Sequence, residues 1–150
     1  MLPTIRSTNP TRNVLFGGLS FMNPTWINSH PDDLLFPPDD PHLLLEVHSY
    51  SPFNFCGKPT KISWDSSVID SWVAGLDAWA TQRNRSVLVG EFGCKTAQTN
   101  TSGRYEWYSY MVGKCRAKGW ASARHQLQPK LTPMATCPVF DRGVPCTLPP

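Results

Sequence analysis

Three polar residues follow apolar segments of the chain at positions where they could act together. Glu91 comes directly after the apolar run at residues 87–89, and His48 and Tyr50 follow the apolar run at residues 43–45. Residues two apart on a strand project from the same face, so His48 and Tyr50 should share a side. A carboxylate at the end of an apolar strand is costly to bury unless a hydroxyl or an imidazole bonds to it. Such partners would keep Glu91 ionised and aimed, as a carboxylate nucleophile requires.

Aromatic residues in the predicted loops could bind a sugar. Trp26, Trp64 and Phe53 are candidates, because an aromatic face stacks on the C–H face of a pyranose ring. The aromatic residues and the polar residues above also have ordinary structural interpretations. Aromatic residues in loops just as often cover the core. His48 alone is typical of a core or surface histidine, and Glu91 alone could lie at a helix N-terminus.

The elements that would position these residues alternate between strands and helices. A long loop rich in Asn, Pro and Asp follows the first strand and ends at Pro41. Strands alternating with helices predict an α/β fold with a parallel sheet, whose carboxyl edge is where ligands bind. The predicted strands are 13–17, 42–47, 86–90 and 120–123, and the predicted helices are 66–84 and 102–118.

Hydrophobic periodicity predicts which side of each element is buried. The unbroken apolar run at 43–45 is typical of a strand covered on both faces. We expect Ser66 or Ser67 to cap the first long helix. Its apolar stripe is Val68, Ile69, Trp72, Leu76 and Trp79, and that of the second helix is Tyr105, Tyr108, Val112 and Cys115.

Two motifs in order resemble glycoside hydrolase family 5, which includes endoglucanases. Residues 45–52 (Leu-Glu-Val-His-Ser-Tyr-Ser-Pro) match the family's sixth-strand His-x-Tyr-x-Pro segment, and residues 89–93 (Val-Gly-Glu-Phe-Gly) match its seventh-strand nucleophile motif. Residues 5–12 resemble the approach to its fifth strand. The resemblance implies a partial (β/α)₈ TIM barrel, roughly strands 5 to 8 with their helices. Residues 1–123 would be the C-terminal half of the catalytic barrel and 124–150 an irregular, Pro-rich or altered tail.

The same resemblance implies a function and the residues that perform it. Glu91 would be the nucleophile of a retaining glycosidase, Tyr50 its hydrogen-bond partner, and His48 a contact to the sugar or the catalytic carboxylates. The substrate would be a β-linked glucan such as cellulose, bound by Trp26 and Trp64. The parent protein would act outside the cell, although this chain shows no signal peptide.

The chain departs from the family in two places. The family's proton donor is the Glu of an Asn-Glu-Pro motif, which is absent here; Asn9-Pro10 and Asn23-Pro24 both lack the Glu. Glu46 is a poor substitute, because it should lie one layer deeper in the barrel and make a buried ion pair. No Trp follows the last strand, where Ala123 precedes Arg124-His125. We therefore expect a fragment that is inactive alone, self-associates through its open sheet edges, and has a tail altered by splicing or a frame shift.

Composition excludes several other classes of function. The net charge is +3 without a basic run, which argues against nucleic acid, and no apolar run reaches the roughly 18 residues that a membrane helix needs. Five cysteines form no metal-ligand spacing, and no cofactor is implied. Cys56 and Cys94 follow neighbouring strands, and a disulfide and two free thiols are equally compatible with that. Two alternatives remain open: an inactive carbohydrate-binding or degenerate module, and an unrelated parallel α/β domain.

Overall fold

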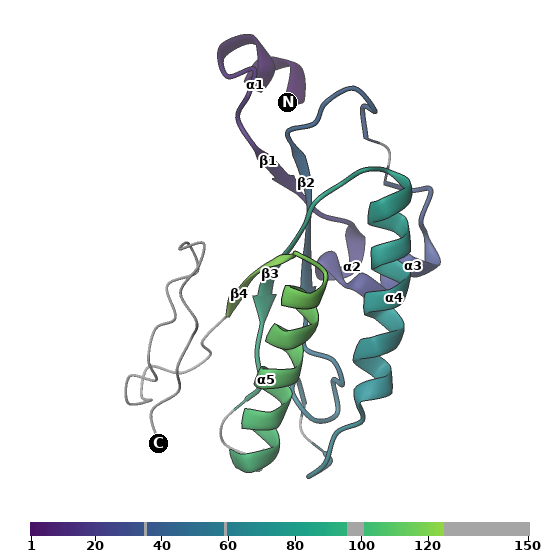
Figure 1. Ribbon diagram of the computed structural model, residues 1–150, viewed down its shortest axis with the longest axis vertical. Helices are drawn as coiled ribbons and strands as arrows, with labels where there is room; N and C mark the ends of the chain where they lie inside the picture. Colours follow the sequence, from purple (N-terminus) through teal and green to yellow (C-terminus); the bar gives the residue numbers. More distant parts are fainter. Residues whose placement is uncertain (35, 59, 96–100, 125–150) are drawn as a thin grey trace.

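The computed structural model describes residues 1–34, 36–58, 60–95 and 101–124, which contain a four-stranded parallel sheet with helices (Figure 1). The strands lie in chain order, β1-β2-β3-β4, and each pairs in parallel with the next. The predicted α/β fold with a parallel sheet is therefore confirmed. The strands are β1 (Val14–Phe16), β2 (Leu43–Ser49), β3 (Val87–Phe92) and β4 (Ala121–Arg124).

The central strand β2 has one covered face and one open face. Leu43, Leu45 and Val47 are at most 4% exposed, whereas the residues between them, Leu44 and Glu46, are partly exposed. The expectation that this apolar run is covered on both faces is wrong for the described residues. We call the buried side the helix face and the other side the inner face.

The helix α4 (Ser66–Gln82) packs on the helix face with a continuous apolar stripe. Its N-cap is Asp65, whose carboxylate accepts from the Ser67 backbone at 2.9 Å, so the predicted Ser66 or Ser67 cap is wrong by one or two positions. Val68 is exposed, contrary to prediction, because the stripe turns away from it. The buried residues are Ile69, Trp72, Val73, Leu76, Trp79 and Ala80.

The helix α5 (Thr101–Ala117) lies beside α4 and buries one residue in every four. Its buried residues are Gly103, Trp107, Met111 and Cys115, so only Cys115 of the predicted stripe is buried, and Tyr105 is 45% exposed. Aromatic residues occur on several sides of this helix, so periodicity alone chose the wrong stripe. Gly119 ends the segment with a positive φ of 68°, a conformation that glycine adopts without strain.

Three short helices were not predicted: α1 (Leu2–Thr8), α2 (Leu19–Met22) and α3 (Pro24–Ser29). The start of the α3 helix has a recognisable sequence pattern. Asn23 is the N-cap and its side chain accepts from Thr25 N at 2.8 Å, and Pro24 is in the first turn. Asn28 donates to the Trp72 carbonyl of α4 at 3.0 Å, which fixes α3 to the helix layer. Most of the predicted tail lies at residues 125–150, outside the described residues.

Candidate active site

The carboxyl edge of the sheet brings His48, Tyr50 and Glu91 together, as predicted from their strands. His48 is in β2, Tyr50 follows that strand, and Glu91 is the penultimate residue of β3. His48 and Glu91 are paired across the two strands. The site therefore rests on adjacent strands of the sheet, which place side chains more rigidly than loops do.

An extra residue in β3 turns Glu91 toward the inner face. Val47 pairs with Val89, but the next residue of β2, His48, pairs with Glu91 and skips Gly90. The pairing of β3 with β4 also gains one residue between Val89 and Phe92. Strict alternation would put Glu91 on the helix face with Val89, and a bulge re-aims the side chain. The irregularity at Gly90 therefore puts the carboxylate beside His48 while Phe92 remains buried.

Two side chains engage the two oxygens of the Glu91 carboxylate. The Tyr50 hydroxyl donates a hydrogen bond to Oε1, and His48 Nδ1 lies 3.4 Å from Oε2. Burial raises the pKa of the Tyr50 phenol above its usual value, and the Glu91 carboxylate raises it further. Tyr50 thus stays protonated at neutral pH and can donate its hydrogen bond. This bond fixes the orientation of Glu91 Oε1, and Oε2 lies beside the His48 imidazole.

A second carboxylate, that of Glu46, lies near the other ring nitrogen of the His48 imidazole. Its Oε1 lies 3.4 Å from His48 Nε2 and fills the space that a side chain on residue 90 would occupy. Glu46 is about 23% exposed, so the contact that it makes with His48 is only partly buried, whereas a buried ion pair was predicted for it. Sequence reasoning missed the role of Gly90, whose missing side chain leaves room for this carboxylate.

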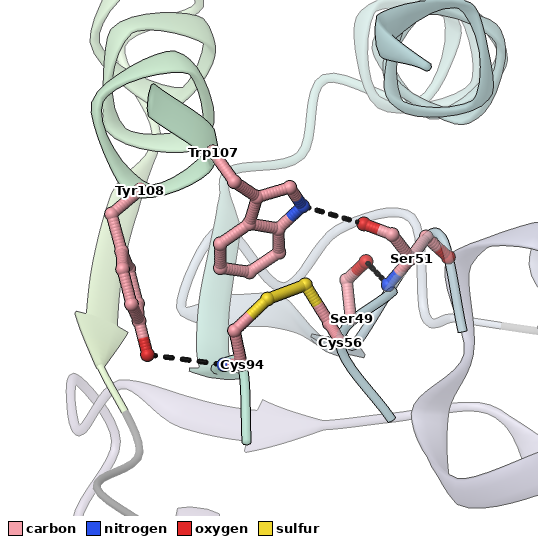
Figure 2. Close-up of a disulfide and its surroundings, with 6 residues drawn as sticks. All are labelled: Ser49, Ser51, Cys56, Cys94, Trp107 and Tyr108. Atoms are coloured by element: carbon pink, nitrogen blue, oxygen red, sulfur yellow. Dashed lines mark hydrogen bonds between the residues drawn. A yellow bond between two sulfur atoms is a disulfide. The ribbon is translucent and has the colours of Figure 1, made fainter. Parts of the chain in front are cut away.

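The loops that follow β2 and β3 are tied together beside the site (Figure 2). A disulfide joins Cys56 to Cys94, which resolves the alternative that the sequence left open. Two residues of α5 hold the same loops: Trp107 Nε1 donates to the Ser51 carbonyl at 2.8 Å, and Cys94 N donates to the Tyr108 hydroxyl at 3.1 Å. The ends of both strands are therefore anchored to the helix layer.

Comparison with known proteins identifies the fold and the family. The family model described as Cellulase (glycosyl hydrolase family 5) matches residues 1–126. The chain belongs to this family. The predicted resemblance is confirmed, and the parallel sheet is part of a family 5 barrel.

Relatives of this family 5 chain are longer than the chain itself. Endoglucanase H of Acetivibrio thermocellus is 30% identical over 149 residues, which are 96% of this chain and 14% of that protein. A hyperthermophilic endo-β-1,4-glucanase solved with substrate superposes with a TM-score of 0.72 at 24% identity, over 85% of this chain and 44% of that one. A family 5 lichenase from Caldicellulosiruptor sp. F32, solved with cellotetraose, gives 0.71 at 25% identity, over 81% and 36%. The chain thus spans less than half of each of these proteins.

The two tryptophans predicted to bind substrate both pack against other rings in this family 5 chain. Trp26 lies in α3 and stacks on His30, with ring centroids 4.6 Å apart and planes 11° apart. Trp64 packs edge-on against Tyr110 of α5 at 5.3 Å. Both rings are only partly exposed and also contact the core. The contacts observed for them therefore lie in the helix layer and the loop after β1, and their binding role stays a prediction.

Other kinds of site were sought in the described part of the family 5 chain. Nowhere in it do three His, Cys, Asp or Glu side chains converge as metal ligands would, and no helix there has the length and apolarity to cross a membrane. An open hollow lined by residues 8–13 precedes β1 and so lies at the amino edge of the sheet, opposite Glu91.

Proposed function

We propose that the chain carries the nucleophile half of a retaining glycoside hydrolase site that acts on β-linked glucans. Glu91 would attack the anomeric carbon, and Tyr50 and His48 would orient it. The observation that carries the proposal is the contact of both carboxylate oxygens with Tyr50 and His48 at the carboxyl edge of a family 5 sheet. The endoglucanase relatives support a polysaccharide substrate.

The proposed reaction needs a second carboxyl group. In the first step the Glu91 oxygen bonds to C1 of the sugar while the glycosidic C–O bond breaks, and the leaving oxygen takes a proton from an acid about 5–5.5 Å from the nucleophile. The sequence has no Asn-Glu-Pro motif that would supply this acid. Glu46 does not replace this acid, because it lies two residues before His48 in β2 and its carboxylate already contacts the His48 ring. We therefore propose that the acid/base is supplied from outside this chain, which alone does not hydrolyse polysaccharide.

A substrate that needs no acid tests the nucleophile directly. A 2-deoxy-2-fluoro-β-cellobioside of dinitrophenol loses dinitrophenolate without protonation, so attack by Glu91 leaves the sugar bonded to the carboxylate. Intact-mass and peptide mass spectrometry should find one fluorosugar on Glu91. The Glu91→Gln variant should form no adduct, whereas Glu46→Gln, which changes the neighbouring carboxylate, should still form it.

Other outcomes decide between the candidate functions. Label on another carboxylate, or equal labelling of Glu91→Gln, would refute the assigned nucleophile. Binding of cellulose without any adduct would instead favour the inactive carbohydrate-binding module. Rapid hydrolysis of carboxymethylcellulose by the purified chain would show that an acid is present after all.

Two further proposals concern the surroundings of the chain. We propose that the parent acts outside the cell, supported by the Cys56–Cys94 disulfide, because such bonds persist in oxidising compartments. We also propose self-association through the edges of the sheet. Among the described residues β1 and β4 each pair with a single strand, which leaves an edge of each open.

A further inference from the structure

We propose that Phe53 is a stacking platform for a pyranose ring of the bound glucan. The proposal rests on the proposed function, because it assigns part of the binding surface for the same substrate class. Phe53 follows the cis peptide bond between Ser51 and Pro52 in the loop after β2. This loop also begins with Tyr50, so the platform and the nucleophile's partner belong to one segment.

Exposure distinguishes Phe53 from Trp26 and Trp64, the two tryptophans predicted to bind a sugar. Phe53 is 65% exposed, whereas Trp26 is partly buried and stacked on His30, and Trp64 is partly buried and packs edge-on against Tyr110. A single exposed apolar side chain is common on protein surfaces and carries no meaning alone. The support beneath the ring and the position of its loop, which begins at Tyr50, carry the inference.

The Phe53 ring is held in place by a tight turn. Gly57 N and Lys58 N donate to the Phe53 carbonyl at 2.9 and 2.7 Å, and Cys56 N donates to the Pro52 carbonyl at 2.9 Å. The ring occupies the space beside Gly57 that a Cβ there would need. Glycine at 57 therefore lets the ring rest on the backbone, and the rest of the ring faces solvent. A ring that is fixed before binding loses little conformational freedom when a sugar stacks on it.

Two links on either side of Phe53 hold it near Glu91. Three residues before it, Tyr50 donates to the Glu91 carboxylate, and three residues after it, Cys56 is bonded to Cys94 (Figure 2). Three residues of extended chain span at most about 11 Å, which bounds the distance from the Phe53 Cα to the Tyr50 Cα. The Phe53 backbone therefore lies within about 11 Å of the Tyr50 backbone, whose side chain contacts Glu91, and this span is comparable to that of a short oligosaccharide.

Titration of the chain with cellotetraose, followed by isothermal calorimetry, tests the platform without requiring turnover. Phe53→Ala and Phe53→Leu should both weaken binding, by roughly two- to tenfold, because leucine keeps apolar area but lacks the aromatic face. Phe53→Trp should restore the affinity or raise it. Ile62→Ala, which removes an 80% exposed aliphatic residue from the same loop, should leave it unchanged.

The outcomes separate the platform from the proposed function. If the native chain binds cellotetraose and Phe53→Ala binds equally well, the platform is refuted and the glucan assignment stands. Equal losses of cellotetraose affinity for Phe53→Ala and Ile62→Ala would mean that the loop makes only general apolar contact, and would refute the stacking platform. If Phe53→Leu binds as the native chain does, stacking is also refuted. No binding by the native chain to cellotetraose would overturn both proposals. Circular dichroism of each variant checks that the fold is retained.

Discussion

The two faces of the sheet are built from the same strands but differ in what covers them. On the helix face, Leu45, Val47 and Val89 are fully buried against α4 and α5. On the inner face, Leu44 and Leu88 are partly exposed, and Leu15 of β1 is 43% exposed. The polar residues of the candidate site, His48 and Glu91, are on this second face.

This contrast separates what stabilises the chain from what would do its chemistry. Apolar burial on the helix face stabilises the strands, whereas the inner face holds the partly exposed side chains of Glu91, His48 and Glu46. The solved family 5 structures are more than twice as long as the region they share with this chain. We infer that the inner face is the side on which the rest of a barrel would close.

Two neighbouring leucines test the contrast most strongly. Leu45→Ala should lower the free energy of unfolding by about 2–5 kcal/mol, because it leaves a cavity in the helix-face core. Leu44→Ala removes the same atoms one residue earlier from the inner face and should cost about 1 kcal/mol or less. Urea denaturation followed by circular dichroism measures both. Equal losses would mean that the inner face is as well packed as the helix face.

The disulfide at the carboxyl edge should give the next largest effect. Cys56 and Cys94 are 38 residues apart, so replacing both by alanine frees a long loop of the unfolded chain and should cost about 2–4 kcal/mol. Cys115→Ala is the control, because that buried cysteine forms no disulfide. If the double variant loses no more stability than the control, the bond contributes little to holding the edge.

Much of this arrangement could be predicted from the sequence, and its limits have physical causes. Strand ends placed His48, Tyr50 and Glu91 at one edge because all parallel strands end on the same side. The bulge at Gly90 could not be predicted, because one extra residue leaves no mark in the alternation of apolar residues. The family motif at residues 89–93 still implied that Glu91 is the nucleophile, although the bulge could not be predicted. Exposure, which separates Phe53 from Trp26, depends on packing that a sequence pattern does not encode.

A charge at the open edge of β1 tests whether the inner side of the sheet takes part in self-association. Leu15→Lys should reduce dimers and larger species, because lysine at a sheet edge opposes pairing with another strand. Stability at high dilution should change by no more than about 0.5 kcal/mol. Sedimentation velocity over a range of concentrations measures the shift, with Leu19→Lys, exposed on α2, as the control. A native chain that stays monomeric throughout would contradict association through the edges.

The smallest effect is expected from an ion pair between the two helices that cover the sheet. Asp70 of α4 accepts from Tyr110 of α5 at 2.7 Å and lies 2.6 Å from Lys114 Nζ. The hydrogen bonds from Lys114 and Tyr110 hold the pKa of Asp70 below its ordinary value of 3.8, and the Asp70 carboxylate raises the pKa of Lys114 above 10.5. The carboxylate therefore stabilises the folded chain above about pH 4, and this stabilisation is lost as the pH falls through the lowered pKa.

Asp70→Asn should thus lower the urea midpoint slightly at pH 6–7, because an exposed pair contributes little. The difference from the native chain should shrink as the pH is taken through the lowered pKa of Asp70, because below it the native carboxylate is also neutral. It should also shrink above the raised pKa of Lys114, where the ammonium loses its charge. A difference that stays constant from pH 7 down to below the lowered pKa of Asp70 would mean that shape, and not charge, holds this contact. In that event the helix layer would owe its stability to apolar packing even where charged groups meet across it.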